Sequence, residues 1–246
     1  MLAGVAADLG CDVEAFSSHS LTVVPRPAAT REQRIVVQAV DTGMGTVLSV
    51  EAALVEWTRT NAPKDRHFRA LQPFFLAQLA EQARSAGFAG ATAHGFSLGF
   101  ALARPPQTPS LPRGFHLLEV DGAWMARYRP SRMFENALGE PDDPEDANKT
   151  QVAFAALDDA GEPAAVAGIW HESHDRNEIG VEVRRESRGL GLAKAVVAVA
   201  TDNILSRGRV PFYSCGATNI RSHRNALTCG FLPLYITGMV RRTPPS

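Results

Sequence analysis

Residues 181–194 read VEVRRESRGLGLAK, and no other stretch of the chain is as informative. Alternating β-branched residues up to Val183 predict a strand, and the apolar run after Gly191 predicts a long helix. Glycine removes side chains where a backbone turns sharply, and the first N–H groups of a helix have no partner within it. Arg188 adds positive charge beside the turn. A strand, a glycine turn and a helix N-terminus in this order indicate a site for a pyrophosphate group.

A second pattern lies downstream, where residues 219–231 read NIRSHRNALTCGF. Two glycines alone would be weak grounds for a phosphate site, because many strand-to-helix turns use glycine only for tightness. The two patterns together resemble those of the GNAT superfamily of N-acetyltransferases, R-G-x-G-x-[GA] followed by N-x-x-[SA] and G-F. They read RGLGLA at 188–193 and N-x-x-S…G-F at 219–231, and the resemblance extends over about 115–241.

This resemblance implies an α/β fold, in which helices flank a GNAT-type mixed sheet that is splayed at its centre, and it implies acetyl-CoA as co-substrate. In this family the strand before the turn pairs with the pantetheine arm through its backbone. A Val181 N–H near the acetyl carbonyl would then stabilise the developing oxyanion. The cofactor-binding residues implied by the resemblance are Val181, Val183, Arg188, Gly189, Leu190, Gly191, Leu192, Ala193, Asn219 and Ser222.

The sequence offers more than one candidate for the general acid and for the general base. Many family members place a tyrosine seven residues after the asparagine to protonate the departing thiolate, but here the residue is Ala226. Tyr235 is a candidate nearby in sequence, and unassisted departure of the thiolate is the other possibility. Glu182 is the first candidate for the base that deprotonates an ammonium acceptor. Glu178 and Glu172 are the alternatives, and each of these carboxylates can also be read as a surface or ion-paired group.

The segment His171-Glu172-Ser173-His174 looks like a metal-binding motif at first sight. Its spacing differs from the helical H-E-x-x-H site, and on a strand His171 and Glu172 face opposite ways. No metal site is therefore predicted. Trp170 is interpreted as a packing residue and Cys215 as a small buried residue.

Composition bounds the class of protein. The 246 residues include 25 basic and 26 acidic side chains, which give a net charge of −1, and 45% are hydrophobic. Without a basic stripe we expect no nucleic-acid partner, and without a long apolar window we expect no membrane span. Met1–Gly10 is read as a core helix rather than a signal peptide. Three cysteines are too few for a disulfide framework, so a cytoplasmic location is expected.

The proline-rich segment 105–113 predicts a linker between two parts. The first, 1–104, is expected to be a smaller α/β half, and a degenerate GNAT-like copy is one interpretation of it. The second, 114–246, is the expected acetyltransferase domain. Expected strands are 21–24, 34–40, 46–50, 94–102, 115–120, 123–128, 152–157, 164–171, 178–183, 211–214 and 232–240, with 115–128 a hairpin on Asp121-Gly122. Expected helices are 1–10, one from 49 or 51 to about 59, 71–85, 131–138, 189–206 and 220–229, the last capped by Thr218 or Asn219.

The sequence therefore predicts direct transfer of an acetyl group from acetyl-CoA to a primary amine, on a small molecule or a peptide N-terminus. A non-catalytic acyl-CoA binding or regulatory module is the alternative, which the missing tyrosine leaves open. A tRNA-dependent aminoacyl transferase with a related doubled fold is disfavoured by the near-neutral charge.

Overall fold

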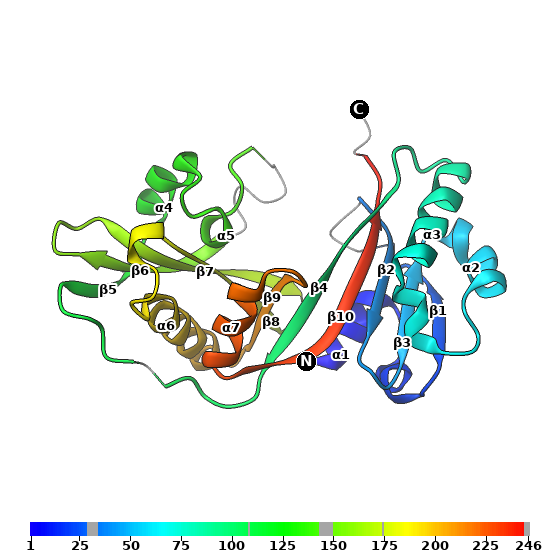
Figure 1. Cartoon of the computed structure of the whole chain (residues 1–246), viewed down its shortest axis with the longest axis horizontal. Coiled ribbons are helices and arrows are strands. Elements are labelled where there is room, and N and C mark those ends of the chain that lie inside the picture. The colour runs from blue at the N-terminus through cyan, green and yellow to red at the C-terminus, as the bar shows by residue number, and fades with distance from the viewer. Residues whose placement is uncertain (29–33, 108, 143–149, 174, 244–246) are drawn as a thin grey trace. The chain divides into compact units, whose positions relative to one another are not determined.

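The computed structural model describes residues 1–28, 34–107, 109–142, 150–173 and 175–243 (Figure 1). Contacts divide the chain into two compact units. The first unit comprises Met1–Gly99, Cys215–Thr218 and Pro233–Ser246, and the second comprises Phe100–Ser214 and Asn219–Leu232. The sequence-based division at 104 placed the C-terminal segment with the second half. The contacts instead group it with the first unit, because its strand pairs there with a strand from the N-terminal part.

The first unit is built around strands that run in the order β1-β3-β2-β10-β4. β1 and β3 are parallel, whereas β2 is antiparallel to both β3 and β10. The strands are β1 (Leu21–Pro25), β2 (Ile35–Asp41), β3 (Thr46–Val50), β4 (Thr92–Leu102) and β10 (Phe231–Arg241). The helices are α1 (Leu2–Leu9), α2 (Val55–Asn61) and α3 (Pro73–Ser85), with single 3-10 turns η1 (Val13–Ser17), η2 (Ala52–Leu54) and η3 (His67–Leu71).

The two faces of this first sheet are covered by separate hydrophobic clusters. α3 begins with Pro73 at its first turn, where the missing N–H costs nothing, and buries Leu76 and Leu79 against β2 and β3. α1 ends at Gly10 in the left-handed region and buries Leu9 with Phe16 in the second cluster. Met1–Gly10 is therefore a core helix, as its apolar pattern predicted.

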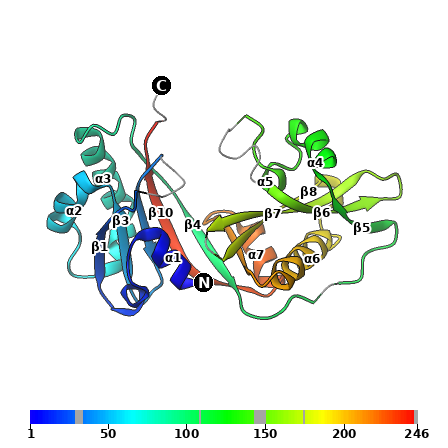
Figure 2. The same cartoon turned by 180° about the vertical axis from the view of Figure 1, so that it is seen from behind.

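The second unit contains strands in the order β9-β8-β7-β6-β5, antiparallel except for β8 and β9, which are parallel. Figures 1 and 2 show α4 and α5 on one face of its sheet and α6 on the other. The strands are β5 (Phe115–Val120), β6 (Thr150–Asp158), β7 (Pro163–Ser173), β8 (Arg176–Val183) and β9 (Val210–Gly216). The helices are α4 (Gly122–Tyr128), α5 (Glu135–Leu138), α6 (Leu192–Ser206) and α7 (Ile220–Thr228), with 3-10 turns η4 (Arg129–Ser131) and η5 (Arg185–Ser187).

The expected hairpin over 115–128 is wrong in its second strand. Residues Gly122–Tyr128 form α4, and Asp121 caps it by accepting the Trp124 N–H at 2.8 Å. An Asp-Gly pair serves a tight turn and a helix start equally well, so the local signal was ambiguous. β5 pairs instead with β6, whose partners lie more than 30 residues away in the sequence. The helix expected over 131–138 is also shorter, because only Glu135–Leu138 is α-helical.

Among the described residues, none of the helices has the length and the apolar character that a crossing of the membrane requires.

Candidate functional site

The parallel strands of the second unit separate part-way along their length. β8 and β9 pair only from Arg176 with Val210 to Glu178 with Phe212. β8 then continues to Val183 and β9 beyond Phe212 without further pairing between them in the part of the chain that the structure describes. This opening confirms the sheet splayed at its centre that the sequence led us to expect.

The backbone of β8 turns its free hydrogen-bonding groups toward this opening. The Arg184 N–H donates to the Ala164 carbonyl on the β7 side at 2.8 Å. Because backbone groups alternate in direction along a strand, the N–H and C=O of Val183 and Val181 face the opposite edge. The carbonyl oxygen of Val183 accepts one hydrogen bond there, from Nε of Arg188 at 3.2 Å. The opening therefore carries the backbone donors and acceptors that an extended ligand can pair with.

The strand leads into a turn that presents a helix N-terminus. Gly189 and Gly191 both have positive φ, at 85° and 80°, which explains the glycines, and a Cβ built at either would meet nothing within 4 Å. Gly191 occupies the N-cap of α6 and supplies no side-chain cap. Leu190 is exposed, Ala193 is half-buried and Leu192 is buried. The outward N–H groups of this first turn are thus accessible to an anion.

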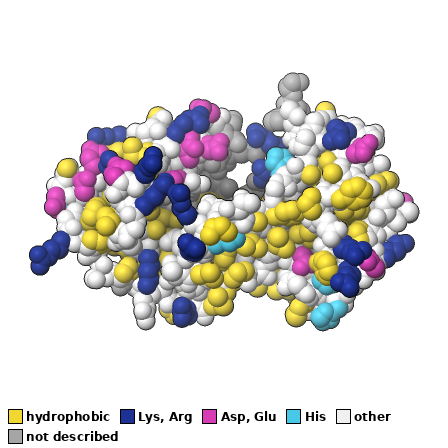
Figure 3. Space-filling view, in the orientation of Figure 1, with side chains coloured by type: hydrophobic (Ala, Val, Ile, Leu, Met, Phe, Trp, Pro, Cys, Tyr) yellow, Lys and Arg dark blue, Asp and Glu magenta, His cyan; other side chains and the backbone are white. Residues whose placement is uncertain are grey.

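Positive charge surrounds this turn. Figure 3 shows Lys and Arg side chains gathered over the segment that joins β8 to α6, which contains Arg184, Arg185 and Arg188. Arg184 forms an ion pair with Glu186 at 2.5 Å. A hydrogen bond from its own backbone, followed by the charge of Arg184, holds the pKa of the exposed Glu186 carboxyl below its usual value. One carboxylate is therefore offset by several guanidinium groups, which leaves the turn electropositive.

The start of α7 carries the second predicted motif. Asn219 Oδ1 accepts the Ser222 N–H at 3.2 Å, so Asn219 is the helix cap, and its side chain is exposed. Ser222 Oγ lies 2.7 Å from the hydroxyl of Tyr213, which is 2% exposed. Asn225 Nδ2 donates to the same hydroxyl at 3.5 Å. The Ser222 side chain therefore anchors α7 to β9, while the exposed Asn219 amide remains available to a ligand.

The Glu178 carboxylate lies where β8 and β9 part, and the sequence predicted it only as an alternative base. Glu178 Oε2 accepts the indole N–H of Trp170 at 3.2 Å, and its Oε1 accepts the hydroxyl of Ser214 from β9. Trp170, interpreted above as packing, is therefore a hydrogen-bond donor as well. Ser214 was not singled out, because the sequence shows no link between residues that lie 36 positions apart. Register alone brings the three side chains together.

Glu182 lies on the same face of β8 as Glu178, and its carboxylate accepts a hydrogen bond from the Asn136 amide of α5. α5 can lie this close because Gly168 and Gly180 are cross-strand partners beneath it. A Cβ at Gly168 would collide with the Ala137 carbonyl oxygen, and one at Gly180 with that of Asn136. These glycines therefore fix α5 over β8 and hold Asn136 beside Glu182.

Residues 117–231 match the model of the acetyltransferase (GNAT) family. This part of the chain is a GNAT domain. No curated protein sequence matches the chain at the required significance. A solved structure of a Drosophila protein is similar in fold, with a TM-score of 0.53 and 17% identity over 82% of this chain and 72% of its own. A GNAT-family protein from Novosphingobium aromaticivorans aligns with a TM-score of 0.49 and 20% identity over 63% and 69%. A GNAT-family acetyltransferase from Colwellia psychrerythraea aligns at 0.46 and 14% over 68% and 63%.

Membership of this family supports acyl transfer as the general reaction of the GNAT domain. The domain brings the predicted strand, turn and α7 cap into one unit, but the predicted acid Tyr235 falls elsewhere. Tyr235 belongs to the first unit, where it packs against the cluster of α1 and β2 and lies against Gly99. Ala226, at the family's tyrosine position, is fully buried. The side chains of Glu172 and His174 lie outside the described residues.

Among the side chains that the structure describes, no three His, Cys, Asp or Glu residues come together in a way that could hold a metal ion. His171 Nδ1 instead lies 2.5 Å from a guanidinium nitrogen of Arg209.

Proposed function

We propose that the GNAT domain transfers an acetyl group from acetyl-CoA directly to a primary amine of a small molecule or of a peptide N-terminus. The observation that carries this proposal is the parting of β8 and β9 after Glu178. It leaves the backbone groups of Val181 and Val183 unpaired by β9 on the strand that leads into the N-terminus of α6. An extended arm beside the strand and a pyrophosphate at the helix would both be satisfied there.

The chemistry requires the acceptor nitrogen to attack the thioester carbonyl carbon. A C–N bond forms, the C–S bond breaks, and the ammonium proton must leave before or during the attack. The Val181 N–H would donate to the carbonyl oxygen as negative charge develops on it. The thiolate would take its proton from water, since Tyr235 packs within the first unit.

Glu182 is our choice for the base that takes the proton from the acceptor. It lies beside Val181 on the cofactor strand, and its carboxylate is held by Asn136. Glu178 is the competing choice, because it lies at the point where the strands part. Both oxygens of Glu178 already accept hydrogen bonds, from Trp170 and Ser214. The described contacts of Glu182 include one donor, Asn136, which leaves its other carboxylate oxygen for the acceptor proton.

A non-catalytic acyl-CoA binding module is the second candidate, and Ala226 favours it because the family's usual acid is missing there. Release of free thiol from acetyl-CoA, measured with a panel of amines, distinguishes the two. We expect saturable thiol release with at least one amine and a product heavier by one acetyl group. Binding of CoA without thiol release across amino acids, polyamines, aminoglycosides and peptide N-termini would support the binding module instead.

A further inference from the structure

The first unit contains a cavity of about 420 Å³ that is independent of the proposed transfer site. It lies beside β1, the edge strand of this unit, and is lined by three basic or titratable side chains, Arg59, Lys64 and His67. Its volume lies in the range of small-molecule sites, which is roughly 300–1,000 Å³.

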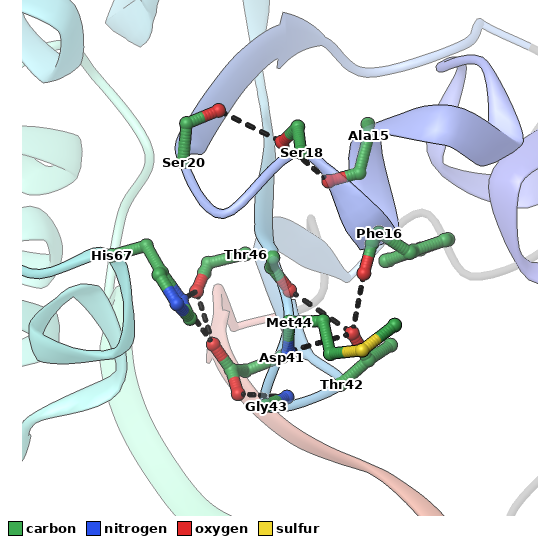
Figure 4. Close-up of polar contacts among 11 residues, drawn as sticks. Ala15, Phe16, Ser18, Ser20, Asp41, Thr42, Gly43, Met44, Thr46 and His67 are labelled. Atoms are coloured by element: carbon green, nitrogen blue, oxygen red, sulfur yellow. Dashed lines mark hydrogen bonds and ion pairs between the residues drawn. The ribbon is translucent and has the colours of Figure 1, made fainter.

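His67 is held in a fixed orientation by groups behind it. Figure 4 shows its ring directed at Asp41 and Thr46 of the β2–β3 hairpin. Nδ1 lies 3.0 Å from Asp41 Oδ2 and 2.9 Å from Thr46 Oγ1. Asp41 also accepts the Gly43 N–H at 2.7 Å and the Thr46 hydroxyl. Because Nδ1 is engaged, Nε2 is the ring nitrogen left for the cavity, and it has no hydrogen-bond partner among the described residues.

The carboxylate behind His67 is itself buried, with Asp41 only 7% exposed and Thr46 fully buried. A buried carboxylate is costly unless several donors satisfy it, and here three do. The network therefore holds the imidazole ring in one orientation. With Nδ1–H donated to Asp41, Nε2–H is a donor to an anion in the doubly protonated ring, and a donor already held in place loses less conformational entropy when a ligand binds.

The charged side chains that line the cavity include two cations, Arg59 and Lys64. Arg59 donates to the Val23 carbonyl at 3.3 Å, and neither it nor Lys64 has an acidic partner in the described part of the chain. Among the described residues that line the cavity there is no aspartate or glutamate, and the nearby Asp65 pairs with Arg69 at 2.7 Å. Two cations and an oriented imidazole without a carboxylate between them attract an anion.

Apolar side chains also line the cavity. They are Leu21 and Val23 of β1 together with Ala62 and Pro63, which follow α2. A ligand that contacts both kinds of side chain carries a charged head and a hydrophobic body.

We propose that this cavity binds a small organic anion, with a carboxylate or phosphate head at Arg59, Lys64 and His67 Nε2 and an apolar body against Leu21 and Pro63. The simpler reading is that the Asp41–Thr46–His67 network only fastens η3 to the hairpin. His67→Asn separates the two, because the asparagine amide reproduces the Nδ1 donor to Asp41 and removes the Nε2 nitrogen from the cavity.

Titration calorimetry with the whole protein at constant ionic strength tests the proposal. The probes are benzoate, phenyl phosphate, acetate and inorganic phosphate. We expect saturable binding of benzoate or phenyl phosphate, at least 10-fold tighter than that of acetate or inorganic phosphate, and the tighter of the two identifies the head group. The imidazole Cε1–H resonance that is missing in His67→Asn should shift on titration.

The variants complete the design. His67→Asn and Lys64→Gln should each weaken the probe at least 5-fold and leave the melting temperature within about 2 °C. Arg66→Gln, an exposed arginine two residues from Lys64 that does not line the cavity, is the matched control and should bind normally. The absence of saturable binding, an equal loss in Arg66→Gln, or unchanged binding in both His67→Asn and Lys64→Gln would overturn the proposal.

Discussion

The side chain of Arg188 reaches back to the end of β8, where its Nε donates to the Val183 carbonyl at 3.2 Å. This hydrogen bond links the end of β8 to the residue that precedes the glycine turn. It also restrains the orientation of the planar guanidinium, because one donor of its fixed fork is engaged. The positive charge is thereby held at the turn in which Gly189 and Gly191 present the start of α6.

We expect Gly191→Asp to weaken CoA binding at least 10-fold in calorimetry. The substituted carboxylate would repel a pyrophosphate at the helix N-terminus, although a Cβ there meets nothing within 4 Å. Any side chain at φ 80° costs roughly 1 kcal/mol of stability. Gly208→Asp is the matched control, with φ 68° and equally open space beyond the far end of α6. Unchanged affinity in a folded Gly191→Asp protein would place the pyrophosphate elsewhere.

The Asn219 side chain can act through its cap, its amide or both, and two variants separate these roles. Asn219→Asp keeps an oxygen for the Ser222 N–H, so the free energy of unfolding should change by less than about 0.5 kcal/mol. Its KM for acetyl-CoA should nevertheless rise several-fold, because the amide donor is lost. Asn219→Ala should in addition lose about 1 kcal/mol of stability. A normal KM for acetyl-CoA in Asn219→Asp would mean that Asn219 acts only as the cap of α7.

Glu182→Gln should lower kcat by about 10²-fold and remove the acidic limb of the pH–rate profile, since an amide cannot accept the proton. Glu178→Gln should lower kcat less, because the amide oxygen can keep one donor while the Ser214 hydroxyl rotates to accept from the amide. Glu119→Gln, an exposed carboxylate on β5, is the control. A retained acidic limb in Glu182→Gln, together with its loss in Glu178→Gln, would transfer the role to Glu178.

Gly180→Ala should destabilise the second unit by roughly 1–3 kcal/mol, because the added methyl group would collide with the Asn136 carbonyl and displace α5. Urea unfolding measures this loss. Gly122→Ala in α4 is the control, since its Cβ meets nothing within 4 Å and alanine favours a helix by up to about 1 kcal/mol. Equal stability of the two variants would mean that α5 does not rest on the glycine pair.

Burial, opposed by a hydrogen bond with Thr228 and the charge of Lys194, raises the pKa of Cys229 from 9.0 to about 11. Between these values the native protein keeps a proton that the unfolded chain releases. The free energy of unfolding therefore falls as pH rises from about 9 to 11, and Cys229 contributes no such fall below pH 9. Urea unfolding at pH 8.5 and 10.5 should show a smaller fall in Cys229→Ala. The same slope in both proteins would contradict a buried thiol.

The sequence determined the features that depend on local geometry. The strand Arg176–Val183, the positive-φ glycines and the helix that follows them were readable because side-chain periodicity and turn chemistry involve neighbouring residues. The cap at Asn219 was readable for the same reason, since a cap and its N–H lie three residues apart. The first unit contains no comparable sequence motif, so its histidine network was not predicted.

The side-chain contacts and strand pairings that depend on register and on distant partners appear only in the tertiary structure. The Asp121-Gly122 pair begins a helix and not a hairpin, because β5 pairs with β6. Glu178 meets Ser214 across 36 residues, Asn136 meets Glu182 across 46, and His67 meets Asp41 across 26. A one-residue slip of a strand would send each side chain to the opposite face, so these contacts exist only after the sheets have formed. The pairing of β10 with β2 likewise joins the two ends of the chain through backbone hydrogen bonds, which carry no side-chain signal in the sequence.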